Sequence, residues 1–312
     1  MTTRLQQAHD TDEGLVVAAH GRHCVVESPD GERRICTPRG KKSQAVVGDR
    51  VLWQAPPPGQ GDTGTVEKVV ARRNLFYRQD ELRTKSFAAN LDQILMLVAA
   101  EPEFSAMQLS RALIAAEAAG IVPIVGVNKS DLVEPFARAW ERLLPYRRMK
   151  YGVLPLSLTA SPDADREELT KLLHGKTTLV LGPSGAGKST LINLMVPGAL
   201  ALTGEISQAL NSGKHTTTST SFYWVPGEER VTGIIDSPGF QEFGLYHIEP
   251  PQLAANMPDI AAHAGECKFY NCSHLHEPGC GVRTALEAGE IDAHRYKIYT
   301  ELHAELSEPK RY

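Results

Sequence analysis

Residues 182 to 189 read GPSGAGKS, which matches the pattern G-x-x-x-x-G-K-[ST] of a phosphate-binding loop. The loop stands between an apolar strand-like run, TTLVL, and a helix-like run that begins near Lys188. Its glycines let the backbone curl around phosphate oxygens, and backbone N–H groups and the helix dipole offset the phosphate charge. We expect Lys188 to reach the β- and γ-phosphates of a nucleotide and Ser189 to ligate Mg²⁺. The predicted phosphate contacts are Gly182, Pro183, Ser184, Gly185, Ala186, Gly187, Lys188, Ser189 and Thr190.

A second apolar strand, within RVTGIIDSPG, ends in Asp236 and is followed by Gly239. An acid at the tip of a strand beside a phosphate-binding loop can hold the metal ion through water, while the N–H of Gly239 can sense the γ-phosphate. The pattern D-x-P-G by itself is a common turn. Paired with the phosphate-binding loop, it predicts a further part of one nucleotide site.

The segment NKSD, residues 128 to 131, follows the buried strand IVPIVGV and has the residues needed to read guanine. The Asp131 carboxylate can accept hydrogen bonds from N1–H and the exocyclic amine of guanine, and Asn128 suits the O6 and N7 side. The stem of Lys129 can cover the base and ribose. An isolated N-K-x-D can instead be a helix cap.

A second guanine-contacting loop is expected after the next strand, VLPL, and SLTA stands there at residues 157 to 160. We therefore place Ser157 in the GTP site. Leu158 occupies a position where the usual pattern has Ala, which weakens this signal, although donation by the backbone N–H survives the change.

The segment NSGKHTTTSTSF lies between the phosphate-binding loop and Asp236 and is polar and rich in hydroxyls. It could become ordered when Thr217, favoured over Thr218, meets Mg²⁺ and the γ-phosphate. Phe240 follows D-S-P-G and cannot orient a water, so we expect His215 to position the attacking water. The predicted catalytic set is His215, Lys188 and Thr217; the alternative for this segment is a solvent-exposed loop.

Three of the five cysteines lie in CKFYNCSHLHEPGC, with the spacing C-x4-C-x-H-x5-C. Three thiols and one imidazole suit a structural tetrahedral zinc with no open position, with His276 as a second choice for the imidazole and ordinary reduced cysteines as the alternative. Cys24 and Cys36 lie in apolar strand-like runs and are expected to be buried structural thiols. The predicted zinc ligands are Cys267, Cys272, His274 and Cys280.

The surrounding elements divide the chain into three predicted domains. Residues 14 to 70 alternate short β-rich runs with turns, which is typical of a small β barrel, and from Asp92 strands alternate with helices, which predicts a parallel sheet covered on both faces. Two helices, in VRTALEAGEI and DAHRYKIYTELHAEL, are expected after the cysteine cluster. We assign residues 1–72 to an oligonucleotide-binding (OB) fold, 73–245 to an α/β P-loop GTPase domain and 246–312 to a mainly helical zinc-binding domain.

The guanine-reading loop precedes the phosphate-binding loop, which reverses the usual order. A parallel sheet brings the loops at the carboxyl ends of its strands together whatever their order in the chain. The sequence therefore predicts a circularly permuted GTPase domain.

The 312 residues carry a net charge of −4, so bulk charge does not indicate a nucleic-acid-binding protein. Residues 1 to 85 have 14 Lys and Arg against 11 Asp and Glu, an excess of 3. The longest apolar run, ILMLVAA, is too short to cross a bilayer, and we expect a cytoplasmic protein. The sequence carries no sign of oligomerisation, and we assume a monomer. An RNA-binding surface is predicted on the barrel and on ARRNLFYRQD, against the alternative of a solvated rim and a packed linker. Its residues are Arg33, Arg34, Arg39, Lys41 and Lys42, with Arg72, Arg73, Arg78, Phe76 and Tyr77.

With these residues placed, nearly the whole chain resembles the bacterial RsgA or YjeQ family, the GTPases that depend on the small ribosomal subunit. The resemblance rests on GRHCVVE, RGK, NLFYRQD, AANLDQILMLVAAEPEFS, NKSD, GPSGAGKST, HTTT, DSPGF-x-EFGL and CKFYNCSHLHEPGC. Departures are small, namely Lys214 before His215, where Arg or Gln is more usual, and Leu158.

The resemblance implies that the small (30S) subunit stimulates GTP hydrolysis during late maturation and that the OB-fold and zinc domains bind 16S rRNA. It also implies a hydrolytic role for His215, one structural Zn²⁺ held by the four residues named above, and Mg²⁺ bound with GTP. An RNA-binding assembly factor that holds GTP as a structural ligand is the alternative. A P-loop ATPase or kinase conflicts with Asp131.

Overall fold

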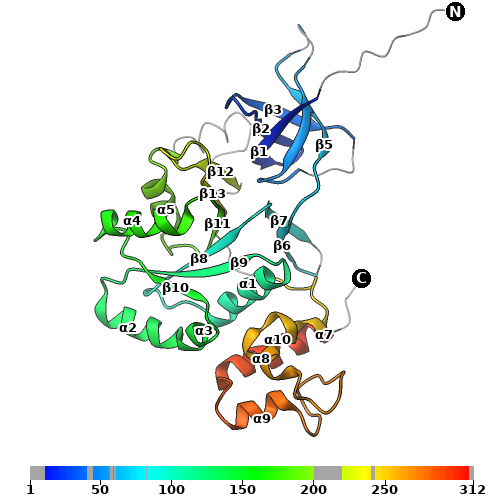
Figure 1. Ribbon diagram of the computed structural model, residues 1–312, viewed down its shortest axis with the longest axis vertical. Coiled ribbons are helices and arrows are strands. Elements are labelled where there is room, and N and C mark those ends of the chain that lie inside the picture. Colours follow the sequence, from blue (N-terminus) through cyan, green and yellow to red (C-terminus); the bar gives the residue numbers. More distant parts are fainter. Residues whose placement is uncertain are drawn as a thin grey trace, which may run out of the picture.

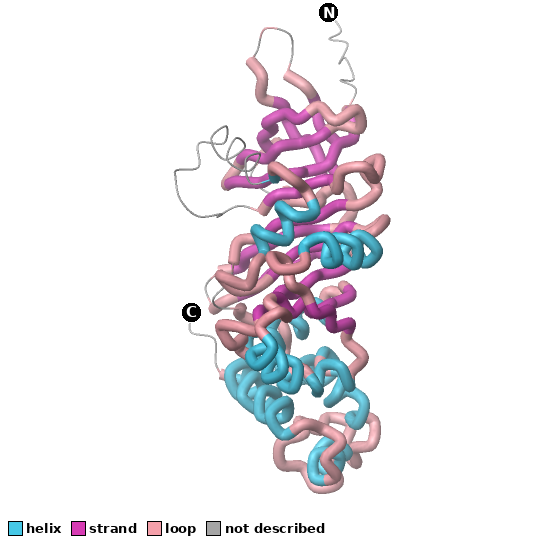
Figure 2. The backbone as a smooth tube through the Cα atoms, turned by 90° about the vertical axis from the view of Figure 1, so that its left-hand side faces the viewer, coloured by secondary structure: helices cyan, strands magenta, loops and turns pink. Residues whose placement is uncertain are grey.

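The structure is a computed structural model that describes residues 11–40, 45–56, 59, 61–81, 83–199, 220–239 and 243–308. A β barrel lies at one end, an α/β sheet in the middle and a helical unit at the other end (Figure 1), and the perpendicular view in Figure 2 shows the same elongated order. Among the described residues, no helix is long and apolar enough to span a membrane.

The N-terminal unit is the five-stranded barrel that the sequence predicts. Its strands are hydrogen-bonded in the order β1-β2-β3-β5-β4, and β4 pairs back with β1, which closes the barrel. Val16, Val26, Val51 and Trp53 fill its interior. The strands are β1 (Asp12–His20), β2 (His23–Glu27), β3 (Arg33–Pro38), β4 (Arg50–Gln54) and β5 (Gly64–Val69).

Cys24 and Cys36 lie opposite each other on β2 and β3, inside the barrel, and both are buried. Burial raises the pKa of Cys24 to about 12 and that of Cys36 to about 11. Both groups therefore stay protonated at neutral pH and pack as small apolar side chains, as predicted.

The central sheet continues in the order β10-β9-β8-β11-β13-β12, in which only β12 runs antiparallel to its neighbour. Alternation along β8 separates two cores: Met96 and Val98 pack in the core that contains Leu109 of α1, whereas Leu97 packs in the core that contains Leu169 of α4. Helices therefore cover both faces, as predicted. The strands are β8 (Gln93–Ala99), β9 (Val122–Asn128), β10 (Gly152–Pro155), β11 (Thr177–Leu181), β12 (Ser221–Trp224) and β13 (Gly233–Asp236). The helices are α1 (Ala106–Ala118), α2 (Val133–Arg142), α3 (Leu144–Arg148), α4 (Pro162–Leu173) and α5 (Lys188–Met195).

Strand β12, which the sequence analysis did not identify, joins the central sheet to the barrel. Ser221 of β12 pairs with Ala18 of β1, so one continuous sheet of eleven strands runs through both units. Trp224 at the end of β12 donates from its indole N–H to Glu27 of the barrel over 2.7 Å.

Residues 75 to 89 form a separate hairpin of β6 (Leu75–Gln79) and β7 (Thr84–Ala89). Phe76 is 0% exposed and packs against Phe87 and Phe243, with each pair of ring centroids 5.6 Å apart. The prediction that Phe76 stacks on RNA is therefore wrong, because the pairing of β6 with β7 directs this ring toward the core. Tyr77 lies beside His247, with ring centroids 4.4 Å apart.

The C-terminal unit is helical. Its last two helices are the ones that the sequence predicts, and the helices before the cysteine cluster are additional. The elements are α7 (Pro250–Leu253), η1 (Ala254–Asn256), α8 (Pro258–Ala264), α9 (Gly281–Glu287) and α10 (Ala293–Ser307).

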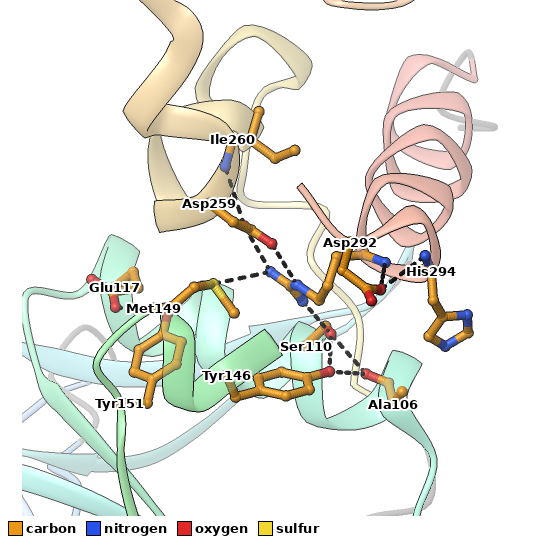
Figure 3. A network of polar contacts seen from close by, with 11 residues as sticks. Ala106, Ser110, Glu117, Tyr146, Met149, Tyr151, Asp259, Ile260, Asp292 and His294 are labelled. Carbon is orange, nitrogen blue, oxygen red and sulfur yellow. Dashed lines mark hydrogen bonds and ion pairs between the residues drawn. The ribbon is translucent and has the colours of Figure 1, made fainter. Parts of the chain in front are cut away.

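A buried arginine attaches this unit to the central domain, and Figure 3 labels its partners Asp259, Ser110 and Tyr146. Arg295 of α10 is 3% exposed and forms a two-pronged ion pair with Asp259 of α8, with N–O distances of 2.8 and 3.1 Å. Its third nitrogen donates to Ser110 of α1 over 2.6 Å, and its guanidinium lies 5.1 Å from the ring centre of Tyr146 of α3. Because the charge is buried, its partners must all stay in place.

Asp259→Ala is expected to destabilise the protein by about 3–5 kcal/mol, because it leaves the Arg295 guanidinium buried without a counter-ion. Urea unfolding measures the change. Glu301→Ala on α10, which breaks an exposed pair with Lys297, is the matched control and should change stability little. Equal effects of the two variants would contradict the assignment of Arg295 as the fastening residue.

Candidate nucleotide and metal sites

Five strands of the central sheet run parallel, so the segments after their carboxyl ends meet at one edge. The phosphate-binding loop and NKSD both lie at this edge, although they are more than 50 positions apart in the sequence. The segments are those that follow Ala99, Asn128, Pro155, Leu181 and Asp236.

The phosphate-binding loop joins β11 to α5, where it was predicted. Gly182 lies so close to β8 that a Cβ would stand 2.1 Å from the carbonyl oxygen of Leu97, so only glycine fits there. The Lys188 ammonium donates to the carbonyl oxygens of Gly182 and Pro183 over 2.8 Å each. Burial lowers the pKa of Lys188, and the carboxylate of Asp236 opposes this effect.

Asn128 connects the two loops directly. Its amide nitrogen donates to the carbonyl oxygen of Ala186 over 3.0 Å, and its amide oxygen accepts from the N–H of Lys129 over 2.8 Å. Gly187 has a φ of 102°, and a Cβ there would stand 2.2 Å from the Asn128 amide nitrogen. Glycine at 187 therefore serves the contact between loops as well as the turn.

The predicted second guanine loop contacts the first. The Ser157 hydroxyl donates to the Asp131 carboxylate over 2.6 Å, and the Leu158 N–H donates to the Asn128 amide oxygen over 3.3 Å. Asp165 at the start of α4 accepts from the Ser157 N–H over 2.6 Å and fixes this loop. Sequence reasoning missed Asp165, because it is one of several acids in its helix and carries no motif.

Lys129 has a φ of 65° and its ammonium donates to the carbonyl oxygen of Glu101 over 2.5 Å. Its side chain thus runs from the NKSD loop to the segment after β8. The stem is half-buried, in a position to line the same edge of the sheet.

Asp236 ends β13 and is 4% exposed, and Ser237 after it donates to the carbonyl oxygen of Val180 over 2.7 Å. A Cβ on Gly239 would lie 3.3 Å from the Lys188 ammonium and 3.4 Å from the N–H nitrogen of Ser184. The D-x-P-G turn therefore lies against the phosphate-binding loop. Burial raises the pKa of Asp236 to about 6, and the Lys188 charge opposes part of this rise.

Several predicted residues fall outside the described residues: His215, Thr217 and the alternative Thr218, together with Lys214 and Phe240. Ser189 and Thr190 lie in the first turn of α5, and both are exposed.

The four predicted metal ligands lie together in the C-terminal unit, with all their ligand atoms within 4.8 Å of one another. The Cys267 and Cys280 sulfurs are 3.8 Å apart, and they lie 3.4 and 3.6 Å from Nδ1 of His274. Two sulfurs at tetrahedral angles, each about 2.3 Å from one zinc ion, would be about 3.8 Å apart. The donor set and its spacing therefore fit a single tetrahedral cation, and exposed His276 is not part of the group.

Neighbouring groups hold the ligand loop in this shape. Glu277 accepts from both the N–H and the hydroxyl of Ser273 over 2.7 Å, and these bonds, led by the hydroxyl, lower the pKa of Glu277. Tyr296 and Tyr299 of α10 donate to the carbonyl oxygens of His274 and Ser273 over 2.7 and 2.8 Å. Two hydrogen bonds thus attach the loop to α10.

The sequence profile of the RsgA GTPase family matches residues 69 to 246, which is more than half of the chain. A small ribosomal subunit biogenesis GTPase RsgA from Variovorax paradoxus (strain S110) is 72% identical over 302 residues, which cover 96% of this chain and 93% of the relative. The chain belongs to the RsgA GTPase family.

Solved structures agree with this membership of the RsgA GTPase family. YjeQ from Thermotoga maritima superimposes with a TM-score of 0.74 at 29% identity, covering 96% of this chain and 99% of that one. YloQ, described as a circularly permuted GTPase, gives a TM-score of 0.70 at 27% identity, covering 99% and 100% of the two chains. The predicted fold class is confirmed.

The arginines predicted to bind RNA on the barrel of this RsgA-family chain have acidic partners. Arg33 pairs with Glu27 over 2.7 Å, and Arg39 pairs with Glu67 over 2.6 Å. Arg34, also on the barrel, pairs with Glu32. At the junction with the central domain, Arg72 pairs with Asp49 and Arg73 pairs with Asp92. Lys41 and Lys42 fall outside the described residues. RNA binding by these arginines stays a prediction.

The nucleotide-free protein is expected to gain stability at neutral pH from Asp236→Asn. Because the pKa of Asp236 is raised from 3.8 to about 6, its ionised form destabilises the fold above pH 6 by up to about 3 kcal/mol, and this cost disappears as pH falls toward 4. Urea unfolding without Mg²⁺ at pH 7.5 and 4.5 measures the difference between variant and wild type. The exposed Asp163→Asn should show no comparable gain, and an equal gain at both pH values would exclude Asp236 as the cause.

Proposed function

We propose that this chain hydrolyses GTP and acts in the biogenesis of the small ribosomal subunit, as the name of its 72% identical relative states for that protein. The observation that carries the GTP site is the 3.0 Å hydrogen bond from Asn128 to Ala186, because it brings the guanine-reading and phosphate-binding loops together. Family membership supports hydrolysis, and the relative's name supports the small subunit as partner.

Within the proposed site, Asn128, Lys129, Asp131 and Ser157 bind guanine, and residues 182 to 190 bind the phosphates. The hydrogen bond from Ser157 fixes the Asp131 carboxylate, which would accept from guanine N1–H and the exocyclic amine. Adenine would leave that carboxylate unpaired, and this disfavours ATP.

Catalysis is proposed to need positioning and charge neutralisation rather than covalent chemistry from the protein. Lys188 would leave the carbonyls of Gly182 and Pro183 for the β- and γ-phosphates. Asp236 would hold the metal ion through water, and the Gly239 N–H would contact the γ-phosphate. Ser189 and Thr217 would hold Mg²⁺, which neutralises phosphate charge when bound. His215 would orient the attacking water.

We further propose that the cluster of Cys267, Cys272, His274 and Cys280 holds one structural Zn²⁺, because three sulfurs and one imidazole leave no open position. Metal analysis that finds no zinc in the folded protein would contradict this. The proposal also includes domain boundaries after residues 72 and 245 and a cytoplasmic location. The barrel and the metal-binding unit are proposed to contact rRNA.

The test is GTP turnover with and without purified small ribosomal subunits. We expect strong stimulation of the wild type and, for His215→Ala, GTP binding close to wild type with turnover lower by about 10²–10⁴-fold, the contribution typical of general acid–base groups. His174→Ala, which changes an exposed histidine after α4 in the central unit, is the control.

Turnover that subunits do not stimulate would favour the alternative, an RNA-binding assembly factor that holds GTP as a structural ligand. Unchanged turnover in His215→Ala would remove that residue from the mechanism and leave the GTP site in place.

A further inference from the structure

Two neighbouring aromatic residues in the metal-binding unit are exposed and are not part of the core. Tyr270 is 102% exposed and Phe269 is 41% exposed, and they are the aromatic members among the large apolar side chains that the described residues expose. Burying such rings would be favourable, so two consecutive residues that leave their rings in water form a candidate contact surface.

The two rings lie at the tip of the Cys267–Cys272 loop, residues 268 to 271. Metal ligands flank the loop on both sides. The Lys268 N–H donates to the Gly279 carbonyl over 2.9 Å, and the Cys272 N–H donates to the Phe269 carbonyl over 3.3 Å. The backbone is therefore fixed at both ends and across the turn. Since the loop is already ordered, little conformational entropy is lost when a partner binds.

The chemistry of the loop tip suits a nucleic acid more than an apolar protein pocket. The Lys268 ammonium lies 5.6 Å from the centre of the Phe269 ring, so a cation accompanies the aromatic faces. All four residues of the loop are exposed, including polar Asn271. Rings combined with a positive charge stack on unpaired bases and meet their phosphates, and small zinc-binding modules are among the common RNA-binding units.

We propose that Phe269 and Tyr270 form a stacking site for unpaired bases of ribosomal RNA, with Lys268 contacting an adjacent phosphate. This inference rests on the proposed function, because it takes the RNA of the small subunit as the partner. The loop belongs to the unit at the end of the molecule opposite the barrel (Figure 1 and Figure 2), so it would provide a contact well separated from the barrel.

The test compares binding to small subunits and to protein-free 16S rRNA, with a non-hydrolysable GTP analogue. Replacing both rings, Phe269→Ala with Tyr270→Ala, should weaken both interactions at least about fivefold, the lower range for loss of base stacking. Tyr270→Trp should retain binding because it keeps a flat ring, whereas Tyr270→Leu keeps only apolar bulk and should weaken it. Val133→Ala, which alters an exposed apolar side chain on α2 (78% exposed), is the control and should bind as the wild type does.

The controls separate failure of this inference from failure of the proposed function. Each variant should keep its metal content and its basal GTP turnover, which shows that both units remain folded. Unchanged binding of the double variant would overturn the inference while the wild type still binds subunits. The inference would also be overturned if the double variant bound more weakly to subunits but not to 16S rRNA and Tyr270→Leu behaved as wild type, because this would indicate a protein contact. If the wild type bound neither subunits nor 16S rRNA, the proposed function would be overturned.

Discussion

The candidate nucleotide site depends on one contact, the hydrogen bond from the Asn128 amide to the Ala186 carbonyl, which joins two distant loops at one edge of a parallel sheet. Geometry permits this contact because strands β8, β9 and β11 run parallel and end together. Glycine at 187 leaves room for the amide, and glycine at 182 lets the phosphate-binding loop pass close to β8. The order of the motifs in the chain has no influence on the resulting pocket.

Permutation changes what the nucleotide site is attached to. The segment between the phosphate-binding loop and β12 leads into a strand that pairs with the barrel, and the segment after Gly239 leads to the C-terminal unit. That unit is fastened to α1 by Arg295, and Arg111 of α1 pairs with Glu305 of α10 and also donates to the Phe243 carbonyl over 3.4 Å. The proposed nucleotide site is thus connected by packed contacts to the units at both ends of the molecule.

Local patterns in the sequence predicted most elements and the loops that meet at one edge of the sheet. Apolar runs of the right length predicted β8, β9 and β11, and the motif spacing predicted which loops converge, because both depend on neighbouring residues. Long-range packing could not be predicted in this way: Phe76 looked available for RNA, yet it is covered by Phe243, which is 167 positions away in the sequence. Asp165 and Arg295 were also missed, since a buried polar residue is recognised only when its partners are known.

The most direct test of the central claim is the base specificity of Asp131→Asn, measured as affinities for GTP and xanthosine triphosphate. Xanthine carries a carbonyl where guanine has its exocyclic amine, and an asparagine amide can donate to it while a carboxylate cannot. If both loops bind one guanine nucleotide, the variant should lose about 10- to 100-fold in GTP affinity and gain affinity for xanthosine triphosphate. GTP affinity equal to that of the wild type would contradict the account.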